Sequence, residues 1–314
     1  MKNLLKFFAI ALFSTVLFSC GGGDDDGTGG GGGSTQTNSN RNNASANPVV
    51  AGLEFPHVTN ERVLVKRITD AVDRTRYKDG VNFSIGYDDN YKLPRYTCYK
   101  MYESNKVANV SRWYPDESLG EYYQYPEDTD IPEAYRLFNE ADPFWNTGYD
   151  HGHMIPSADR LSSKQANVQT FFLSNMLPQT NGFNARVWAN MEAQVRTWNK
   201  ASFRDTLYVV TGGSYQKEEY VLGYIGSTAK KNRIPVPKYF WKAVLCKNSA
   251  GYKALGFWIE HKSNDDSALA KYVVNIDELE NLTGLDFFCN LPDDIEKQIE
   301  AVKKENVAKS FGLK

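Results

Sequence analysis

The residues of this chain that could do chemistry gather in one stretch. The chain has only four histidines, and two of them stand one residue apart in the sequence Asp150-His151-Gly152-His153-Met154. A histidine can act as a general base near neutral pH or can bind a metal. Other polar residues follow downstream: Asn175, Asn184, Glu192 and Arg196. Amide and carboxylate oxygens suit Mg²⁺, so this set of residues indicates metal-assisted hydrolysis of a phosphate ester.

The spacing of these residues predicts how they are presented. If residues 149–154 are extended, His151 and His153 point to the same face. Apolar residues recur at helical spacing from Asn184 to about residue 199, which predicts a helix there. On that helix Asn184, Glu192 and Arg196 are separated by multiples of four and lie along one side. Asn184 and Glu192 could therefore face one ion, while Arg196 could reach a phosphate oxygen.

Hydrolysis of a phosphodiester needs a base for the attacking water. It also needs positive charge on the phosphoryl oxygens and help for the leaving oxygen. A histidine, a metal on Asn184 and an arginine together meet all three needs. Two histidines could instead form a zinc pair, but the downstream Asn and Glu, in place of a third His or Cys, argue against zinc.

The elements that must hold these residues predict an α+β fold of antiparallel sheet with interspersed helices. Alternating or compact apolar runs predict strands at 81–87, 96–102, 170–174, 207–211, 239–245 and 254–259. The first two are expected to form a hairpin or meander, and the last two an antiparallel pair. Gly212-Gly213 is expected to end the strand at 207–211. Short helices are expected after Ser162-Ser163 to about residue 168, and at 276–279 and 292–302.

Residues 144–212 resemble the DNA/RNA non-specific endonucleases of the ββα-metal group. That family has Asp-Arg-Gly-His, then a segment like Ser-Asn-Met-x-Pro-Gln, then Asn-x-x-x-Trp-x-x-x-Glu. The matching stretches here are 149–153, 174–179 and 184–192, continuing to Arg196. The resemblance implies a mostly antiparallel central sheet flanked by helices and a substrate of DNA and RNA.

The resemblance also implies a role for each matching residue. His153 would be the general base, and Asn184 would be the direct Mg²⁺ ligand, with Mn²⁺ or Ca²⁺ as possible substitutes. Glu192 would bind the metal through water, and Arg196 would contact phosphate. The remaining two, Asp150 and Asn175, would support the site.

The chain departs from the family pattern at one position, where His151 stands in place of the arginine. Histidine is shorter than arginine and only partly charged at neutral pH. His151 could still donate a hydrogen bond to phosphate as a catalytic residue. Alternatively, another positively charged residue (Arg95, Arg160 or Arg186) could replace the missing charge. The alternative is a surface nucleic-acid-binding lipoprotein with weakened catalysis. Activity is favoured, because a decaying site would be expected to lose its base and metal ligand too. A phosphodiesterase for small substrates is a third hypothesis.

The N-terminus predicts export. Residues 1–19 have a positively charged start and an apolar run, as in a secretory signal, and they end at a lipobox-like Cys20. We expect cleavage before Cys20 and anchoring through its lipids, giving an outer membrane lipoprotein that faces the periplasm or the cell surface. The Gly-, Asp-, Ser- and Asn-rich residues 20–48 predict a flexible tether. Its Asp24-Asp25-Asp26 resembles a surface-export signal of Bacteroidetes lipoproteins, although a plain solvated linker is the alternative. Residues 49–314 would form a single endonuclease domain.

Charge and cysteine content add two constraints. The net charge of −2 does not favour nucleic-acid binding, but residues 160–204 hold six basic residues and one acidic residue, 6 − 1 = +5. That segment surrounds the motif, so it either holds a polyanion or forms a solvated basic face. If Cys20 is lipidated, Cys98, Cys246 and Cys289 remain. They allow at most one disulfide, of undetermined pairing.

Overall fold

The computed structural model describes residues 36–138, 142–226, 233–264 and 268–314. The predicted signal peptide, Cys20 and the tether up to residue 35 lie outside these residues. The compact unit begins at Gln36, earlier than the expected start at residue 49. The reason is that Asn42, only 5% exposed, donates hydrogen bonds to the carbonyls of Val50 and Pro56. Within the described ranges, every helix is too short or too polar to span a bilayer.

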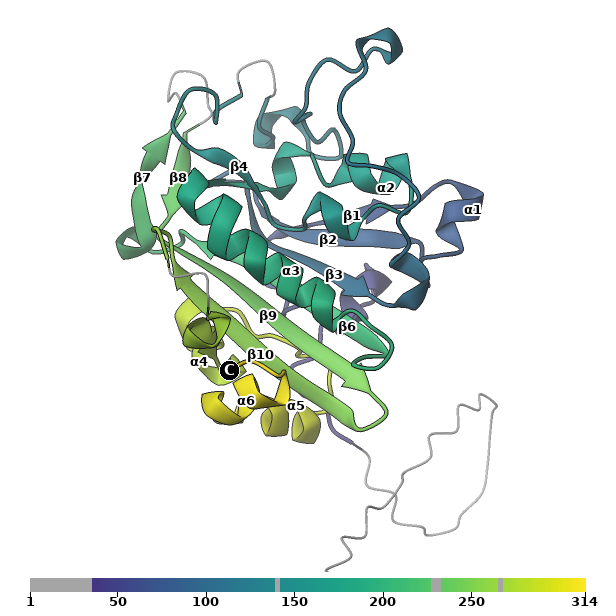
Figure 1. Cartoon of the computed structure of the whole chain (residues 1–314), viewed down its shortest axis with the longest axis vertical. Coiled ribbons are helices and arrows are strands. Elements are labelled where there is room, and N and C mark those ends of the chain that lie inside the picture. The colour runs from purple at the N-terminus through teal and green to yellow at the C-terminus, as the bar shows by residue number, and fades with distance from the viewer. Residues whose placement is uncertain (1–35, 139–141, 227–232, 265–267) are drawn as a thin grey trace, which may run out of the picture. The chain divides into compact units, whose positions relative to one another are not determined.

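A seven-stranded antiparallel sheet is the centre of the fold, in the order β1-β2-β3-β6-β9-β10-β11 (Figure 1). Its strands are β1 (Arg62–Arg67), β2 (Val81–Asp88), β3 (Leu93–Met101), β6 (Thr206–Ser214), β9 (Tyr239–Asn248), β10 (Gly251–Glu260) and β11 (Val273–Val274). Two ribbons lie outside it: β4 (Asp150–His153) with β5 (Met176–Gln179), and β7 (Val221–Ile225) with β8 (Ile234–Pro237). The predicted β2–β3 hairpin and β9–β10 pair are both present.

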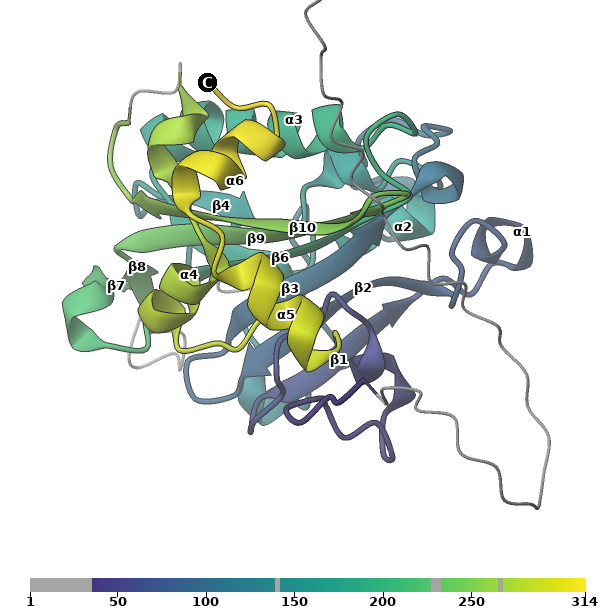
Figure 2. The same ribbon diagram turned by 90° about the horizontal axis from the view of Figure 1, so that it is seen from below.

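Helices cover both faces of this sheet (Figure 2). One face carries α3 (Ala189–Trp198) and α6 (Lys304–Ser310), and the other carries α4 (Ile276–Thr283) and α5 (Asp293–Glu300). A hydrophobic core lies on each face of the sheet, and alternating side chains of β9 contribute to both. Phe240 and Val244 pack on the α3 side, while Trp241 and Leu245 pack on the α4 side. The short α1 (Ala71–Arg74) and α2 (Lys164–Gln169) lie outside these layers, and Ser163 caps α2 as expected.

Two predicted elements were wrong. Residues 170–174 form no strand, because their backbone groups are satisfied by turns and side chains. Thr170 ends α2, and its carbonyl accepts from Asn175 Nδ2 at 2.8 Å. The strand starts later, as β5. Likewise Gly212-Gly213 does not end β6, which continues to Ser214. A Cβ at Gly212 would lie 2.8 Å from the Arg95 carbonyl oxygen, so glycine permits close packing there.

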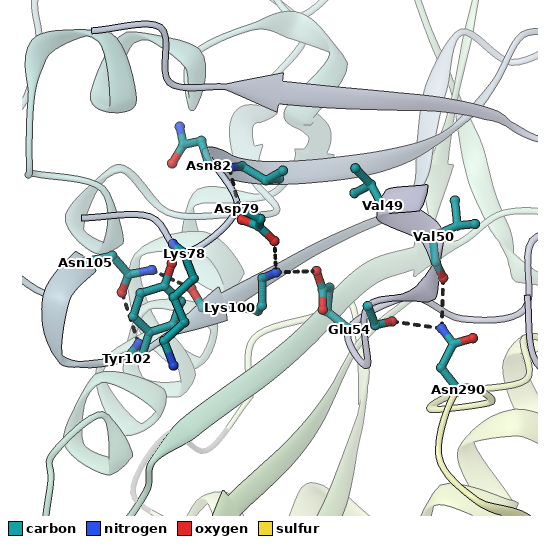
Figure 3. Close-up of polar contacts among 12 residues, drawn as sticks. Val49, Val50, Glu54, Lys78, Asp79, Asn82, Lys100, Tyr102, Asn105 and Asn290 are labelled. Atoms are coloured by element: carbon teal, nitrogen blue, oxygen red, sulfur yellow. Dashed lines mark hydrogen bonds and ion pairs between the residues drawn. The ribbon is translucent and has the colours of Figure 1, made fainter. Parts of the chain in front are cut away.

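A polar cluster fixes the start of the domain to the sheet (Figure 3). Lys100 on β3 forms ion pairs with Asp79 and, at 3.3 Å, with the buried Glu54. On the other side, Asn290 Nδ2 donates to the carbonyls of Val50 and Gly52 at 2.8 and 2.9 Å. These contacts tie residues 50–54 to β3 and to the loop before α5.

Candidate active site

The β4–β5 ribbon and the helix after it bring most of the motif residues together. β4 pairs with β5 so that His153 lies opposite Met176 and Asp150 lies opposite Gln179. The expected helix has two parts: η8 (Phe183–Trp188), a stretch of π-helix that begins beside Asn184, and then α3. Figure 1 shows β4 alongside this helix. A cavity of about 750 Å³, here called the active-site pocket, is lined by residues that include Asp150, His151, His153, Asn184 and Glu192.

Glycine at position 152 is required between the two histidines. A Cβ there would lie 2.4 Å from the Gln179 side chain, which is fully buried against β4. The backbone of β4 can therefore approach β5 only without a side chain at this position.

His153 lines the pocket as a neutral imidazole. Its Nε2 is buried and has no hydrogen-bond partner among the described residues. Burial, with smaller contributions from the charges of Arg112 and His151, lowers its pKa to about 3. Its backbone carbonyl accepts from Trp188 Nε1 at 3.1 Å, and its ring meets Phe171 edge-on at 5.1 Å. The imidazole is thus held in place with one nitrogen free to take a proton.

Asp150 sets the orientation of Asn184. Its Oδ2 accepts from Asn184 Nδ2 at 3.1 Å and from Asn181 Nδ2 at 3.0 Å. An ionised carboxylate only accepts hydrogen bonds, so it must face the amide nitrogen of Asn184 and not its oxygen. Asn184 Oδ1 is then the atom left to act as a ligand in the pocket.

Glu192 adds a carboxylate to the same pocket, two turns further along the helix. Burial raises the pKa of this carboxyl, and the nearby charge of Asp159 acts in the same direction, against the lowering effect of Lys242. Lys242 lies beneath the helix, fully buried, with its Nζ 3.9 Å from the centre of the Trp188 ring and 3.2 Å from Thr211 Oγ1. A divalent cation would favour the ionised form of Glu192.

Asn175 lies outside the pocket and supports β4 from behind. It is fully buried, and all of its polar atoms are engaged. Its Oδ1 accepts from the Ile155 amide at 3.1 Å and its Nδ2 donates to the Ile155 carbonyl at 3.0 Å. Its own carbonyl accepts from the Met154 amide at 3.0 Å. These bonds fix the chain directly after His153.

Two predicted phosphate contacts have other partners in the structure. Arg196 Nη1 pairs with Asp159 at 3.0 Å, and Arg196 is not among the pocket-lining residues. His151 Nε2 lies 3.0 Å from Asp142, and its ring is stacked between Tyr125, at 3.6 Å, and Phe144, at 4.5 Å. The phosphate roles of Arg196 and His151 stay predictions.

Arg112 is the basic residue that sequence reasoning missed. It is exposed and lines the pocket, with its guanidinium 4.6 Å from the centre of the Phe171 ring and its Nη1 donating to Ser157 Oγ at 3.1 Å. Two of the substitutes expected from the sequence are engaged elsewhere. Arg95 pairs with Glu61 at 3.3 Å, and Arg160 is fully buried, donating to the carbonyls of Asn82 and Lys100. The third, Arg186, is exposed on η8 and does not line the pocket.

The residues present fit a divalent metal. Asn184 Oδ1 is directed away from Asp150, the Glu192 carboxyl lines the same cavity, and His153 Nε2 is unpartnered. Two oxygen donors from protein match Mg²⁺, which keeps several waters.

A two-stranded ribbon followed by a helix, with histidine on the ribbon and Asn and Glu on the helix, defines a ββα-metal nuclease site. The profile of the DNA/RNA non-specific endonucleases matches residues 64–294, and the chain belongs to this family. A nuclease from Syncephalastrum racemosum is 36% identical over 179 residues, which are 53% of this chain and 55% of that one. A nuclease from Nostoc sp. is 31% identical over 227 residues, covering 68% of this chain and 78% of that one. The chain thus spans about half of the first relative's length.

A solved structure confirms the α+β, ββα-metal fold. The EndoG/EndoGI complex, described as showing the mechanism of EndoG inhibition, matches with a TM-score of 0.59 at 22% identity. The match covers 76% of this chain and 89% of that one.

None of the three cysteines in the described ranges forms a disulfide; Cys98, Cys246 and Cys289 are free and buried.

Proposed function

We propose that this protein is a Mg²⁺-dependent endonuclease that hydrolyses phosphodiester bonds of DNA and RNA with little sequence preference. The observation that carries the proposal is the pocket that combines a neutral, unpartnered His153 nitrogen with the oxygens of Asn184 and Glu192. Family membership supports the same reaction class. Mn²⁺ or Ca²⁺ could occupy the same oxygen donors.

In the proposed reaction His153 Nε2 takes the proton of the attacking water. Its lowered pKa keeps it unprotonated at neutral pH, and the Trp188 bond to its carbonyl holds it in position. Asn184 and Glu192 would hold the metal, which when bound supplies positive charge to the phosphoryl and leaving oxygens. Arg112 is the side chain of the pocket that can bind a phosphate oxygen with a permanent charge.

The rim of the pocket supports recognition without sequence preference. Trp145 is 83% exposed and Tyr122 is 68% exposed, and both line the pocket together with Tyr123. Aromatic rings stack on the faces of all four bases, so they bind nucleic acid without reading its sequence. Acidic side chains nearby, such as Asp142, favour a substrate held by stacking and metal rather than by a basic groove.

The test is cleavage by the purified chain. Supercoiled plasmid and a structured RNA are incubated with and without Mg²⁺, and with excess chelator. With Mg²⁺ and no chelator, we expect the plasmid to be nicked and then fragmented and the RNA to be fragmented. Intact polymers across pH 6 to 9 with Mg²⁺ would overturn the proposal. Short dinucleotides, run in parallel, separate a polymer endonuclease from a phosphodiesterase for small substrates.

The second candidate function is a surface lipoprotein that binds nucleic acid with weakened catalysis. It is favoured by the packing of His151 between Tyr125 and Phe144, which leaves its position without a free cationic group in the pocket. Salt-sensitive binding of DNA without metal-dependent turnover would select this function.

We further propose that the chain is exported and anchored to the outer membrane through lipids on Cys20, with the following residues as tether. The support is the sequence of residues 1–26 alone. Metabolic labelling with a radioactive fatty acid should mark the wild-type protein and not Cys20→Ser. Equal labelling of both proteins would refute the anchor.

A further inference from the structure

α4 and α5 cover the face of the sheet opposite to α3 (Figure 2), and residues of these two helices line an acidic cavity. Carboxyl groups of Asp277 and Glu280 on α4 and of Glu300 on α5 have ligand atoms within 4.8 Å of one another. These residues line a cavity of about 430 Å³ together with Asp286 and Glu296. Lys297 is the one basic residue among those that line it.

The cavity contains polar oxygens with no partner of their own. Glu300 is only 7% exposed, and its Oε1 is buried without a hydrogen-bond partner among the described residues. Asn40 lines the same cavity, and its Oδ1 is also buried without a partner. The ion pairs found in the described part of the chain include none to Asp277, Glu280 or Glu300. A buried carboxylate oxygen without a cation or donor is costly, and a cation bound beside Glu300 Oε1 would remove that cost.

Hydrogen bonds from the Phe287 amide to Glu280 and from Asn40 Nδ2 to Glu296 offset part of this cost, and protonation offsets more. Burial, together with the charges of neighbouring carboxylates, raises the pKa of Glu300 to about 10 and that of Glu280 to about 8. Burial and the charges of neighbouring carboxylates also raise the pKa of Glu296, to about 7. A divalent cation among these groups would replace those protons and neutralise the repulsion.

We propose that Asp277, Glu280 and Glu300 form a Ca²⁺ site that is separate from the active site. Two oxygens on opposite sides of a Ca²⁺ ion are about 4.8 Å apart, at roughly 2.4 Å from the ion each. Ligand atoms that lie within 4.8 Å of one another can therefore all reach one Ca²⁺ ion. Calcium also accepts irregular sets of carboxylate and amide oxygens, which suits three carboxylates beside an asparagine.

The site has a structural consequence for the start of the compact unit. Asn40 Nδ2 donates to Glu296 at 2.9 Å and to Asp286 at 3.1 Å, so the N-terminal segment lies against the same acidic groups. A bound cation would neutralise the carboxylates beside this contact. Binding should therefore stabilise the docking of residues 36–42 on α5 as well as the α4–α5 pair.

The experiment measures calcium binding in the full chain with the active-site ligand removed. Asn184→Ala is the parent, and Asn184→Ala with Glu300→Gln is compared with it by thermal unfolding in chelator and in Ca²⁺. In the parent, Ca²⁺ at a hundredfold excess over its Kd should raise the Tm by about 5 °C. The Glu300→Gln protein should show no rise, whereas the exposed control Glu305→Gln should behave as the parent does.

Two further readouts separate a cation site from a packing effect. In chelator the Glu300→Gln protein should be about as stable as its parent, because a neutral amide replaces a carboxyl group that burial already keeps protonated when no cation is bound; a loss of stability there would indicate a structural role instead. Equilibrium dialysis with radioactive calcium should find one ion per parent chain and none in the Glu300→Gln protein. Equal binding by both proteins, or no binding by the parent, overturns the proposal. Glu280→Gln serves as a second variant if Glu300→Gln does not fold, with the same expected loss of binding.

Discussion

Replacing Asp150 by alanine should weaken metal binding at the active site without removing a metal ligand. The carboxylate holds the amide of Asn184 through a hydrogen bond of 3.1 Å from Nδ2. A hydrogen bond to a charged acceptor contributes about 1.5–3 kcal/mol. Without it the amide can turn its NH₂ group toward the metal. At about 1.4 kcal/mol per tenfold, the loss corresponds to a metal affinity that is about 10–100-fold weaker, the range typical of groups that orient a metal ligand.

The assay is the initial rate of plasmid nicking as a function of Mg²⁺ concentration, for wild type, Asp150→Ala and Asp150→Asn. The half-maximal Mg²⁺ concentration should rise by about 10–100-fold in Asp150→Ala, and much of the rate should return at saturating metal. Asp150→Asn keeps an acceptor oxygen and should show a smaller rise. The control Asn181→Ala removes only the second donor to Asp150, at 3.0 Å on an exposed residue, and should leave the half-maximal concentration almost unchanged. If Asp150→Ala has the wild-type metal dependence, the orientation argument for Asn184 is refuted.

Three other predictions concern the phosphate contacts and the charge state of the base. His151→Arg should change kcat/KM by less than about tenfold, because the new guanidinium would pair with Asp142; a much larger gain would show that the missing arginine limits the enzyme. Arg112→Ala should lower kcat/KM by about 10–100-fold through loss of a charged phosphate contact, and unchanged kinetics would remove it from the site. Burial of His153 lowers its pKa in the folded state to about 3, so the unfolded chain takes up its proton near pH 6.5 and the folded chain does not. The free energy of unfolding therefore has its full value above pH 6.5 and decreases as the pH falls toward 3. Urea unfolding should therefore show wild type losing about 2 kcal/mol more than His153→Gln between pH 7 and 5, and equal losses would contradict the neutral, buried state.

Local spacing was enough to predict the main parts of the site. The positions of Asn184 and Glu192 along one helix follow from the period of the helix, and the strand that holds His153 matches the extended conformation assumed for residues 149–154. The antiparallel α+β sheet was also predicted from short alternating runs. These features depend on residues close together in the chain, where geometry is nearly fixed by secondary structure.

Features set by tertiary contacts were not predictable in the same way. Arg112 precedes the motif by some forty positions in an acidic, aromatic loop, and nothing in its local sequence marks it as a pocket residue. Asp142, which lies beside His151, comes from the same region. The strand expected at 170–174 is replaced by turns, because Asn175 Nδ2 donates to the Thr170 carbonyl, a side-chain contact that the β-propensities of residues 170–174 do not include. Residues 36–48 are polar, as a tether would be. The Asn42 side chain nevertheless donates hydrogen bonds to the backbone carbonyls of Val50 and Pro56, which holds this segment on the domain.

The most direct test of the account is chemical rescue of His153→Ala. The variant should bind DNA and Mg²⁺ as wild type does, but its rate of cleavage should fall by about 10²–10⁴-fold, the usual contribution of a general base. Added imidazole can enter a pocket of about 750 Å³ and should restore part of that rate in proportion to its unprotonated concentration. If His153→Ala cleaves DNA at the wild-type rate, or if its activity is lost and imidazole restores none of it while folding and metal binding are intact, His153 is not the base.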